Sequence, residues 1–215
     1  MTAEALAHGY QVAVHAIGDR GNSVVLDLYA DVLAEAEPGD YRLRIEHAQI
    51  LAPEDIARFK AHGVIPAMQP TNATSDMYWA AKRLGEKRVR DGGYVWRSLL
   101  ETGVEHLPLG SDFPVEFANP FFGLSAAVTR ADAEGYPPGG WYPDQALTAA
   151  EALKGFTLDA AYAAFEESTK GSLSPGKHAD FVVLDRDILS VRPEEIRDTE
   201  VLETWVGGRR AYRAN

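Results

Sequence analysis

The chain contains no cysteine. Disulfides and thiolate metal sites are therefore excluded, and any bound metal must be held by histidine, aspartate or glutamate. No apolar run approaches the roughly 18 residues that a membrane-spanning helix needs. The amino-terminal stretch "MTAEALAHGY" lacks a basic segment followed by an apolar core, so it does not read as a signal peptide. We expect a cytoplasmic protein that does not enter membranes.

Positive charge is also scarce: the chain has 21 lysines and arginines but 32 aspartates and glutamates, which gives a net charge of −11. This excess of negative charge argues against binding to nucleic acid or to an anionic membrane surface. The apolar content of 46% and the charged content of 25% are ordinary for a globular protein. A length of 215 residues indicates one large domain, or one domain with a small second one.

Apolar segments alternate with helical patterns through the first half of the chain. The segments that we expect to form strands are residues 11–17, 41–50, 64–70 and 106–114. The expected helices between them are residues 22–36, 53–63 and 86–102, and residues 71–82 are expected to form an irregular loop. This alternation favours an α/β fold with a parallel sheet and helices outside it.

The second half of the chain changes character. We expect a short helix near residues 124–130, and Thr148 with Glu151 matches a helix-capping box. From residue 171 the pattern becomes β, and Gly207-Gly208 between two apolar stretches predicts a hairpin turn. We therefore divide the chain into residues 1–168 and residues 169–215.

Three side chains share one kind of position. His15, His47 and Asp112 each lie at the carboxyl end of an expected strand. In a parallel sheet or barrel these ends meet at one edge, where binding sites assemble. Each residue also has an ordinary explanation, as a hydrogen-bonded histidine or a turn aspartate. Their coincidence at three strand ends favours a metal site, because two imidazoles and a carboxylate suit Zn²⁺, Mn²⁺ or Fe²⁺.

Other side chains are weaker candidates. Asp19 either orients a ligand or forms a loop ion pair, and Trp79 either walls a substrate pocket or packs on a neighbouring loop. Arg130 either holds a substrate carboxylate or forms a surface salt bridge. Glu46 points away from His47, because side chains alternate along a strand, and is expected to pair with an arginine. The histidines expected to be non-catalytic are His8, His62, His106 and His178.

Several segments together resemble a known family. They are "VAVHAIGD", "RIEHAQ", "MQPTNATSDM", "GSDFPVE", "GSLSPGKHADFVVLDRD" and "VGGRRAYR". In this order and spacing they resemble the carboxyl-terminal part of metal-dependent amidohydrolases, in the amidohydrolase family 3 (YtcJ-like) branch. The resemblance implies an α/β fold: the C-terminal half of a TIM-like (β/α)₈ barrel, strands five to eight, over residues 1–168. Part of a small β-sandwich would follow over residues 169–215.

The resemblance also implies a chemistry. Family members hydrolyse amide-type, non-peptide C–N bonds of small molecules with one or two divalent metals, so zinc is expected here, with manganese or iron as alternatives. By position, His15 and His47 become the metal ligands from strands five and six. Asp112, at the end of strand eight, becomes both a metal ligand and the general base that activates water.

The chain departs from the family pattern in two respects. It contains no His-x-His pair, which the family places on strand one, and only four barrel strands are expected. We therefore expect a fragment that works with a missing amino-terminal half, or a homo-oligomer formed through open sheet edges. The alternatives are a catalytically incomplete half-barrel that only associates, and a barrel lyase or isomerase.

Overall fold

Two separate sheets organise the chain in the computed structural model, which describes residues 1–215. The first sheet is parallel, in the order β1 (Ala13–Ala16), β2 (Arg44–His47) and β3 (Ile65–Ala67). Parallel neighbours need a crossover connection, and α2 (Asp19–Glu35) and α3 (Pro53–His62) supply it. The predicted alternation of parallel strands and helices is thus confirmed for these elements.

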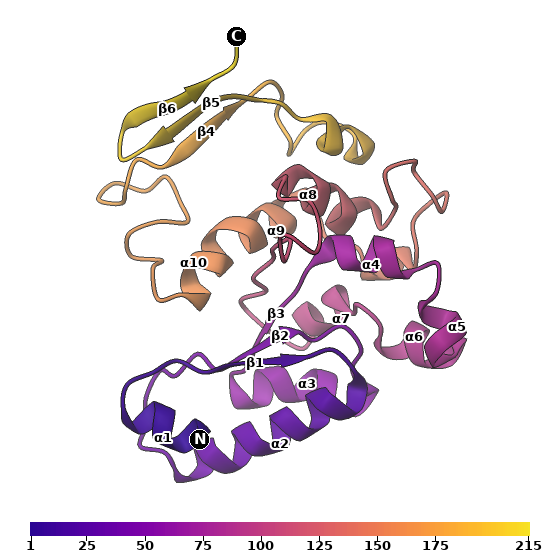
Figure 1. Ribbon diagram of the computed structural model, residues 1–215, viewed down its shortest axis with the longest axis vertical. Coiled ribbons are helices and arrows are strands. Elements are labelled where there is room, and N and C mark those ends of the chain that lie inside the picture. The colour runs from indigo at the N-terminus through magenta and orange to yellow at the C-terminus, as the bar shows by residue number, and fades with distance from the viewer.

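Both crossover helices pack on the same side of the first sheet (Figure 1). The helix α2 buries Leu26 and Tyr29, and the Tyr29 hydroxyl donates a 2.9 Å hydrogen bond to the main-chain oxygen of Arg44 in β2. The helix α3 begins with Pro53 and ends at Gly63, whose φ of +63° suits glycine. It contributes the fully buried Phe59 to the core.

The fourth expected strand does not form a regular ladder. It meets β3 through a single parallel bridge between Met68 and Leu109. Pro108 has no N–H to donate, so the pairing is limited to the hydrogen bonds from Met68 N–H to Pro108 at 2.9 Å and from Gly110 N–H to Met68 at 3.1 Å. The prediction of a strand over residues 106–114 is therefore corrected to an extended segment beside β3.

The prediction of an irregular loop at residues 71–82 is wrong, because helices occupy most of this segment. They are α4 (Pro70–Asp76) and α5 (Ala80–Leu84). Pro70 takes the first position of α4, where its missing N–H costs nothing, and the Thr74 hydroxyl donates to the main-chain oxygen of Thr71. The expected helix over residues 86–102 is confirmed with its break at the glycines, as α6 (Glu86–Gly92) and α7 (Trp96–Glu101).

Helices fill the middle of the molecule. After α1 (Thr2–Ala7) at the amino terminus, the later helical elements are α8 (Pro120–Thr129), η1 (Pro143–Gln145), α9 (Ala149–Lys154), η2 (Gly155–Asp159) and α10 (Ala160–Ala163). The predicted capping box is confirmed: the Glu151 N–H donates to the Thr148 hydroxyl, and the Thr148 N–H donates to the Glu151 carboxylate. No helix combines the length and the apolar character that a membrane crossing requires.

The second sheet is antiparallel and lies at the far end of the molecule from β1–β3, beyond α8, α9 and α10 (Figure 1). Its strands are β4 (Phe181–Leu184), β5 (Val201–Val206) and β6 (Arg209–Arg213), with the helical turn η3 (Pro193–Asp198) before β5. The hairpin predicted at Gly207-Gly208 joins β5 to β6. The two sheets lie on either side of residue 168, although the domain boundary itself stays a prediction.

Candidate functional site

His15 and His47 meet at the carboxyl edge of the first sheet. They lie near the ends of the adjacent parallel strands β1 and β2, where Ala16 is the register partner of His47. Their ring centroids are 4.4 Å apart and the ring planes are inclined by 71°, so one imidazole presents its edge to the other. His47 is buried, whereas His15 is exposed to solvent. The structure thus brings together two of the three side chains that the sequence analysis selected.

The backbone at His47 is unusual for a residue with a β-carbon. His47 has a φ of +82° and Ala48 a φ of +44°, both in the left-handed region that glycine occupies freely. Such a conformation costs about 1–3 kcal/mol per residue and persists only where the surroundings enforce it. Here the Ala48 N–H donates to the main-chain oxygen of Ala16 at 3.0 Å, which holds the turn against β1. Strain of this kind is concentrated at functional sites.

Gln69 contacts the buried histidine from the next strand. Its side-chain oxygen Oε1 lies 2.8 Å from Nδ1 of His47, and its amide nitrogen donates to the main-chain oxygen of Ala67 at 3.3 Å. From the sequence, Gln69 stood out only as a part of the segment "MQPTNATSDM". Its place directly after the third strand, level with the other strand ends, was the signal that could have identified it.

Asp112 lies in an exposed turn that follows the extended segment beside β3. Its φ is +56°, and its main-chain oxygen accepts a hydrogen bond from Val115 N–H at 2.8 Å. No three histidine, aspartate or glutamate side chains of this chain are grouped closely enough to hold a metal ion. The two imidazoles alone are of a kind that can supply two ligands to a divalent metal, and Asp112 is not gathered with them into a three-donor site.

Asp19 forms an ion pair, whereas Trp79 is exposed to solvent. Asp19 is the first residue of α2, and its carboxylate pairs with Nε of Arg88 at 3.2 Å, which is the ion-pair alternative considered above. Trp79 directly precedes α5, and 47% of its surface is exposed. Its indole is thus open to solvent.

Arg130 lies in the core with only 1% of its surface exposed. Its Nε donates to the main-chain oxygen of Trp141 and its Nη1 to that of Tyr94, both at 2.8 Å, while its guanidinium covers the ring of Trp96. Burial lowers the pKa of Arg130 to about 10. This placement gives no support to the predicted contact with a substrate carboxylate, and it assigns Arg130 to holding two loops together.

A second buried network lies beyond the histidine pair. Nε2 of Gln49 donates to the Tyr94 hydroxyl at 2.6 Å and to the Asp76 carboxylate at 3.1 Å, and the Tyr94 hydroxyl also donates to Asp76. Burial is the main cause that raises the pKa of Asp76, and the two hydrogen bonds oppose it. The network ties the segment after β2 to the end of α4, and the sequence analysis did not find it.

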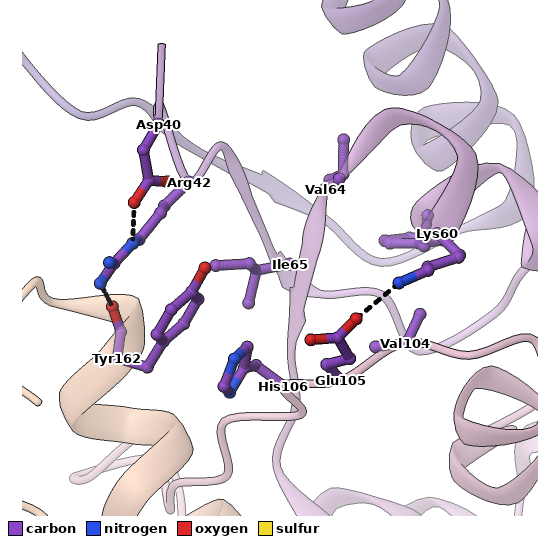
Figure 2. A pocket seen from close by; sticks show the side chains of 11 residues that line it. Asp40, Arg42, Lys60, Val64, Ile65, Val104, Glu105, His106 and Tyr162 are labelled. Carbon is purple, nitrogen blue, oxygen red and sulfur yellow. Dashed lines mark hydrogen bonds and ion pairs between the residues drawn. The ribbon is translucent and has the colours of Figure 1, made fainter.

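A charged cavity of about 170 Å³ lies at the opposite, amino-terminal edge of the first sheet (Figure 2). His106 stacks on Tyr162 there at 3.6 Å between ring centroids, and its Nδ1 lies 2.7 Å from the Asp159 carboxylate. Arg42 pairs with Glu167 through two hydrogen bonds of 2.9 Å. Because its charged groups pair with one another, we interpret this cavity as structural.

Comparisons with known proteins find similarity over nearly the whole chain. A sequence profile described as "Amidohydrolase family" matches residues 1–212. The chain is 41% identical over 207 residues to "Protein LONG AFTER FAR-RED 3" of Arabidopsis thaliana, covering 95% of this chain and 34% of that protein. It is 33% identical over 200 residues to an "N-substituted formamide deformylase" of Arthrobacter pascens, covering 93% of this chain and 36% of that protein.

A solved structure is similar over the same region. It is the crystal structure of an uncharacterized metal-dependent hydrolase from Pyrococcus horikoshii OT3, with a TM-score of 0.76 and 33% sequence identity. The match covers 89% of this chain and 37% of that one. The chain thus spans about a third of the length of the relatives that it matches.

Proposed function

This chain belongs to the amidohydrolase family, and we propose that it forms part of a metal-dependent hydrolase that cleaves amide-type, non-peptide C–N bonds of small molecules. The observation that carries the proposal is the pair of imidazoles from His15 and His47, 4.4 Å apart at the carboxyl edge of a parallel sheet. Sites in barrels of this kind form at that edge. The similarity to the deformylase and to the Pyrococcus metal-dependent hydrolase supports the same reaction class.

The proposed architecture is half of a (β/α)₈ barrel. In it β1, β2, β3 and the extended segment around Leu109 are strands five to eight, and β4–β6 are part of a small β-sandwich. A complete barrel takes about 250 residues, and this chain covers only 37% of the similar hydrolase. The remaining strands, and further metal ligands, would belong to a portion of the enzyme that precedes this sequence.

One or two divalent ions, zinc first and manganese or iron as alternatives, would be held by His15 and His47. Asp112 is proposed as a further ligand, although this structure does not group its carboxylate with the two imidazoles. When bound, such an ion polarises the substrate carbonyl and acidifies water. The Asp112 carboxylate accepts a proton from the attacking water and delivers it to the departing nitrogen. Water oxygen becomes bonded to the carbonyl carbon, the C–N bond breaks, and the products are a carboxylic acid and an amine. Trp79, which is exposed before α5, is proposed to wall the substrate pocket.

N-substituted formamides are the first substrates to test, because a relative at 33% identity is named for deformylating them. In the enzyme completed by the remaining part of the barrel, amine release should require Zn²⁺, stop with a chelator and return when metal is added back. The His47→Ala variant should lose at least about a hundredfold in kcat, while the exposed His178→Ala should match wild type. Turnover that survives both chelation and His47→Ala would contradict the proposal.

One observation favours a second candidate, an incomplete unit that only associates. No three-donor group forms within this chain, and the second sheet exposes Val182, Val206 and Tyr212. Its outer strands β4 and β6 also have open edges for pairing, with a second copy or with a missing amino-terminal half. Light scattering and metal analysis separate the candidates. An oligomer with little metal indicates the second, and a stoichiometric metal with turnover indicates the hydrolase.

A further inference from the structure

We propose that Gln69 is a positioning residue: it fixes the tautomer of His47 so that Nδ1 carries the proton and Nε2 keeps its lone pair for the site. The inference rests on the proposed function for its purpose, because a lone pair on Nε2 is what a metal ligand needs. Its structural basis is independent of any metal, since it follows from hydrogen bonds within the chain.

The contact is a buried one between neighbouring strands. Gln69 and His47 each expose only 8% of their surface, and Gln69 Oε1 lies 2.8 Å from His47 Nδ1. The backbone around Gln69 is held on both sides. The Met68 N–H donates to Pro108 and the Gly110 N–H donates to Met68, while Pro70 begins α4 directly afterwards. Gln69 therefore has a fixed base from which its side chain reaches the histidine.

A second hydrogen bond determines which end of the Gln69 amide faces His47. The main-chain oxygen of Ala67 lies 3.3 Å from Nε2 of Gln69, and a carbonyl oxygen only accepts. The NH₂ group must therefore face Ala67, which directs the oxygen Oε1 at the imidazole. An amide oxygen also only accepts, so His47 Nδ1 must be the donor. A neutral imidazole carries one ring proton, and Nε2 is then left unprotonated.

The result is an imidazole prepared for a cation before one arrives. Histidines that bind metals almost always donate their other ring N–H to an oxygen, which fixes the ring and makes the ligating nitrogen more basic. The edge-on contact with His15, at 4.4 Å between centroids, places a second imidazole beside the prepared one. In this arrangement Gln69 touches neither substrate nor metal, and it acts only through His47.

Nitrogen-15 NMR of the 215-residue chain tests the assignment. Long-range proton–nitrogen spectra at about pH 9, where histidines in general are neutral, distinguish the two tautomers. We expect wild-type His47 to be protonated at Nδ1. Gln69→Met, which keeps the volume and removes the acceptor, should shift His47 towards protonation at Nε2. Gln69→Glu, whose carboxylate also only accepts, should restore the Nδ1 proton.

Gln49→Met is the matched control, because Gln49 is equally buried near the same sheet edge but bonds to Tyr94 and Asp76. It should leave the His47 tautomer unchanged. An Nε2-protonated His47 in wild type would overturn the proposal even if Gln69→Met did not fold. So would an unchanged tautomer in a folded Gln69→Met.

A zinc titration followed on the same signals separates this proposal from the proposed function. Loss of the Gln69 acceptor should weaken zinc binding about tenfold, the lower end of the effect of such partners. If wild type bound no zinc at all, the proposed metal site would fail, and the tautomer spectra would still decide the role of Gln69.

Discussion

The imidazole of His15 lies edge-on to that of His47, with 4.4 Å between ring centroids, across two adjacent parallel strands. Two imidazoles at this separation share one small volume at the sheet edge. His47 is held there by a strained backbone and by Gln69. The relationship is local to this chain, so its consequences are measurable without any other part of an enzyme.

Removal of either imidazole should weaken zinc binding. We expect His15→Ala and His47→Ala each to raise the Kd for Zn²⁺ at least about tenfold in calorimetric titrations, because each removes one direct ligand. His178→Ala removes an exposed histidine of the second half of the chain and should bind like wild type. Equal affinities across all three variants would show that the pair does not bind the metal.

Asp112→Asn should separate catalysis from folding. Asparagine tolerates the φ of +56° as aspartate does but accepts no proton, so kcat for amide hydrolysis should fall about 10²–10⁴-fold. Because the side chain is exposed, the free energy of unfolding measured with urea should change by less than about 0.5 kcal/mol. Glu116→Gln in the same loop loses only a carboxylate that accepts from Ser75, and it should stay active. An active Asp112→Asn would remove the assigned base.

Arg130→Met should destabilise the fold. The change removes two hydrogen bonds and leaves the carbonyl oxygens of Tyr94 and Trp141 without these donors, at a cost of about 3 kcal/mol in the free energy of unfolding. Urea denaturation measures it. Arg83→Met, an exposed helical position, should change stability little. Unchanged stability in Arg130→Met, combined with a raised KM, would return Arg130 to the role of a substrate contact.

The Arg97–Glu151 ion pair should make stability depend on pH. Hydrogen bonds from Arg97, followed by those from Thr148, hold the pKa of Glu151 at about 2 in the folded chain. A depressed carboxyl pKa stabilises the fold above the ordinary value, near 4.5, and this contribution is lost as the pH falls towards 2.

The pair is partly exposed, so the contribution is about 1 kcal/mol after solvent screening. When the pH is lowered from about 6 to about 3, the free energy of unfolding measured with urea should fall by about 1 kcal/mol more in wild type than in Glu151→Gln. Glu35→Gln, which removes an exposed carboxylate that forms no ion pair, should titrate like wild type. Parallel losses in wild type and Glu151→Gln would contradict the assignment.

The sequence predicted correctly those elements that depend on residues close together in the chain. The spacing of apolar residues identified α2, and the Pro53 and Gly63 signals identified the ends of α3. The capping box at Thr148 formed as expected. The pairing of Glu46 with an arginine is also confirmed, through Arg44 at 2.7 Å.

Predictions failed where distant contacts decide the outcome. The extended segment at Leu109 lacks a ladder with β3 because Pro108 has no N–H to donate, and its Leu109 N–H bonds instead to Gly155, far along the chain and on the opposite side from β3. Arg130 was expected at a surface, but aromatic residues from separate segments enclose it. Strand-end counting predicted the approach of His15 and His47. The Gln69 contact needed the three-dimensional register of β2 and β3.

The central claim is that His15 and His47 bind one metal ion. X-ray diffraction at the zinc absorption edge, from crystals of the protein grown with Zn²⁺, tests it most directly. We predict one anomalous peak at the carboxyl edge of the first sheet, about 2.1 Å from Nε2 of His47 and from a ring nitrogen of His15. Zinc bound elsewhere, with neither imidazole among its ligands, would contradict the account.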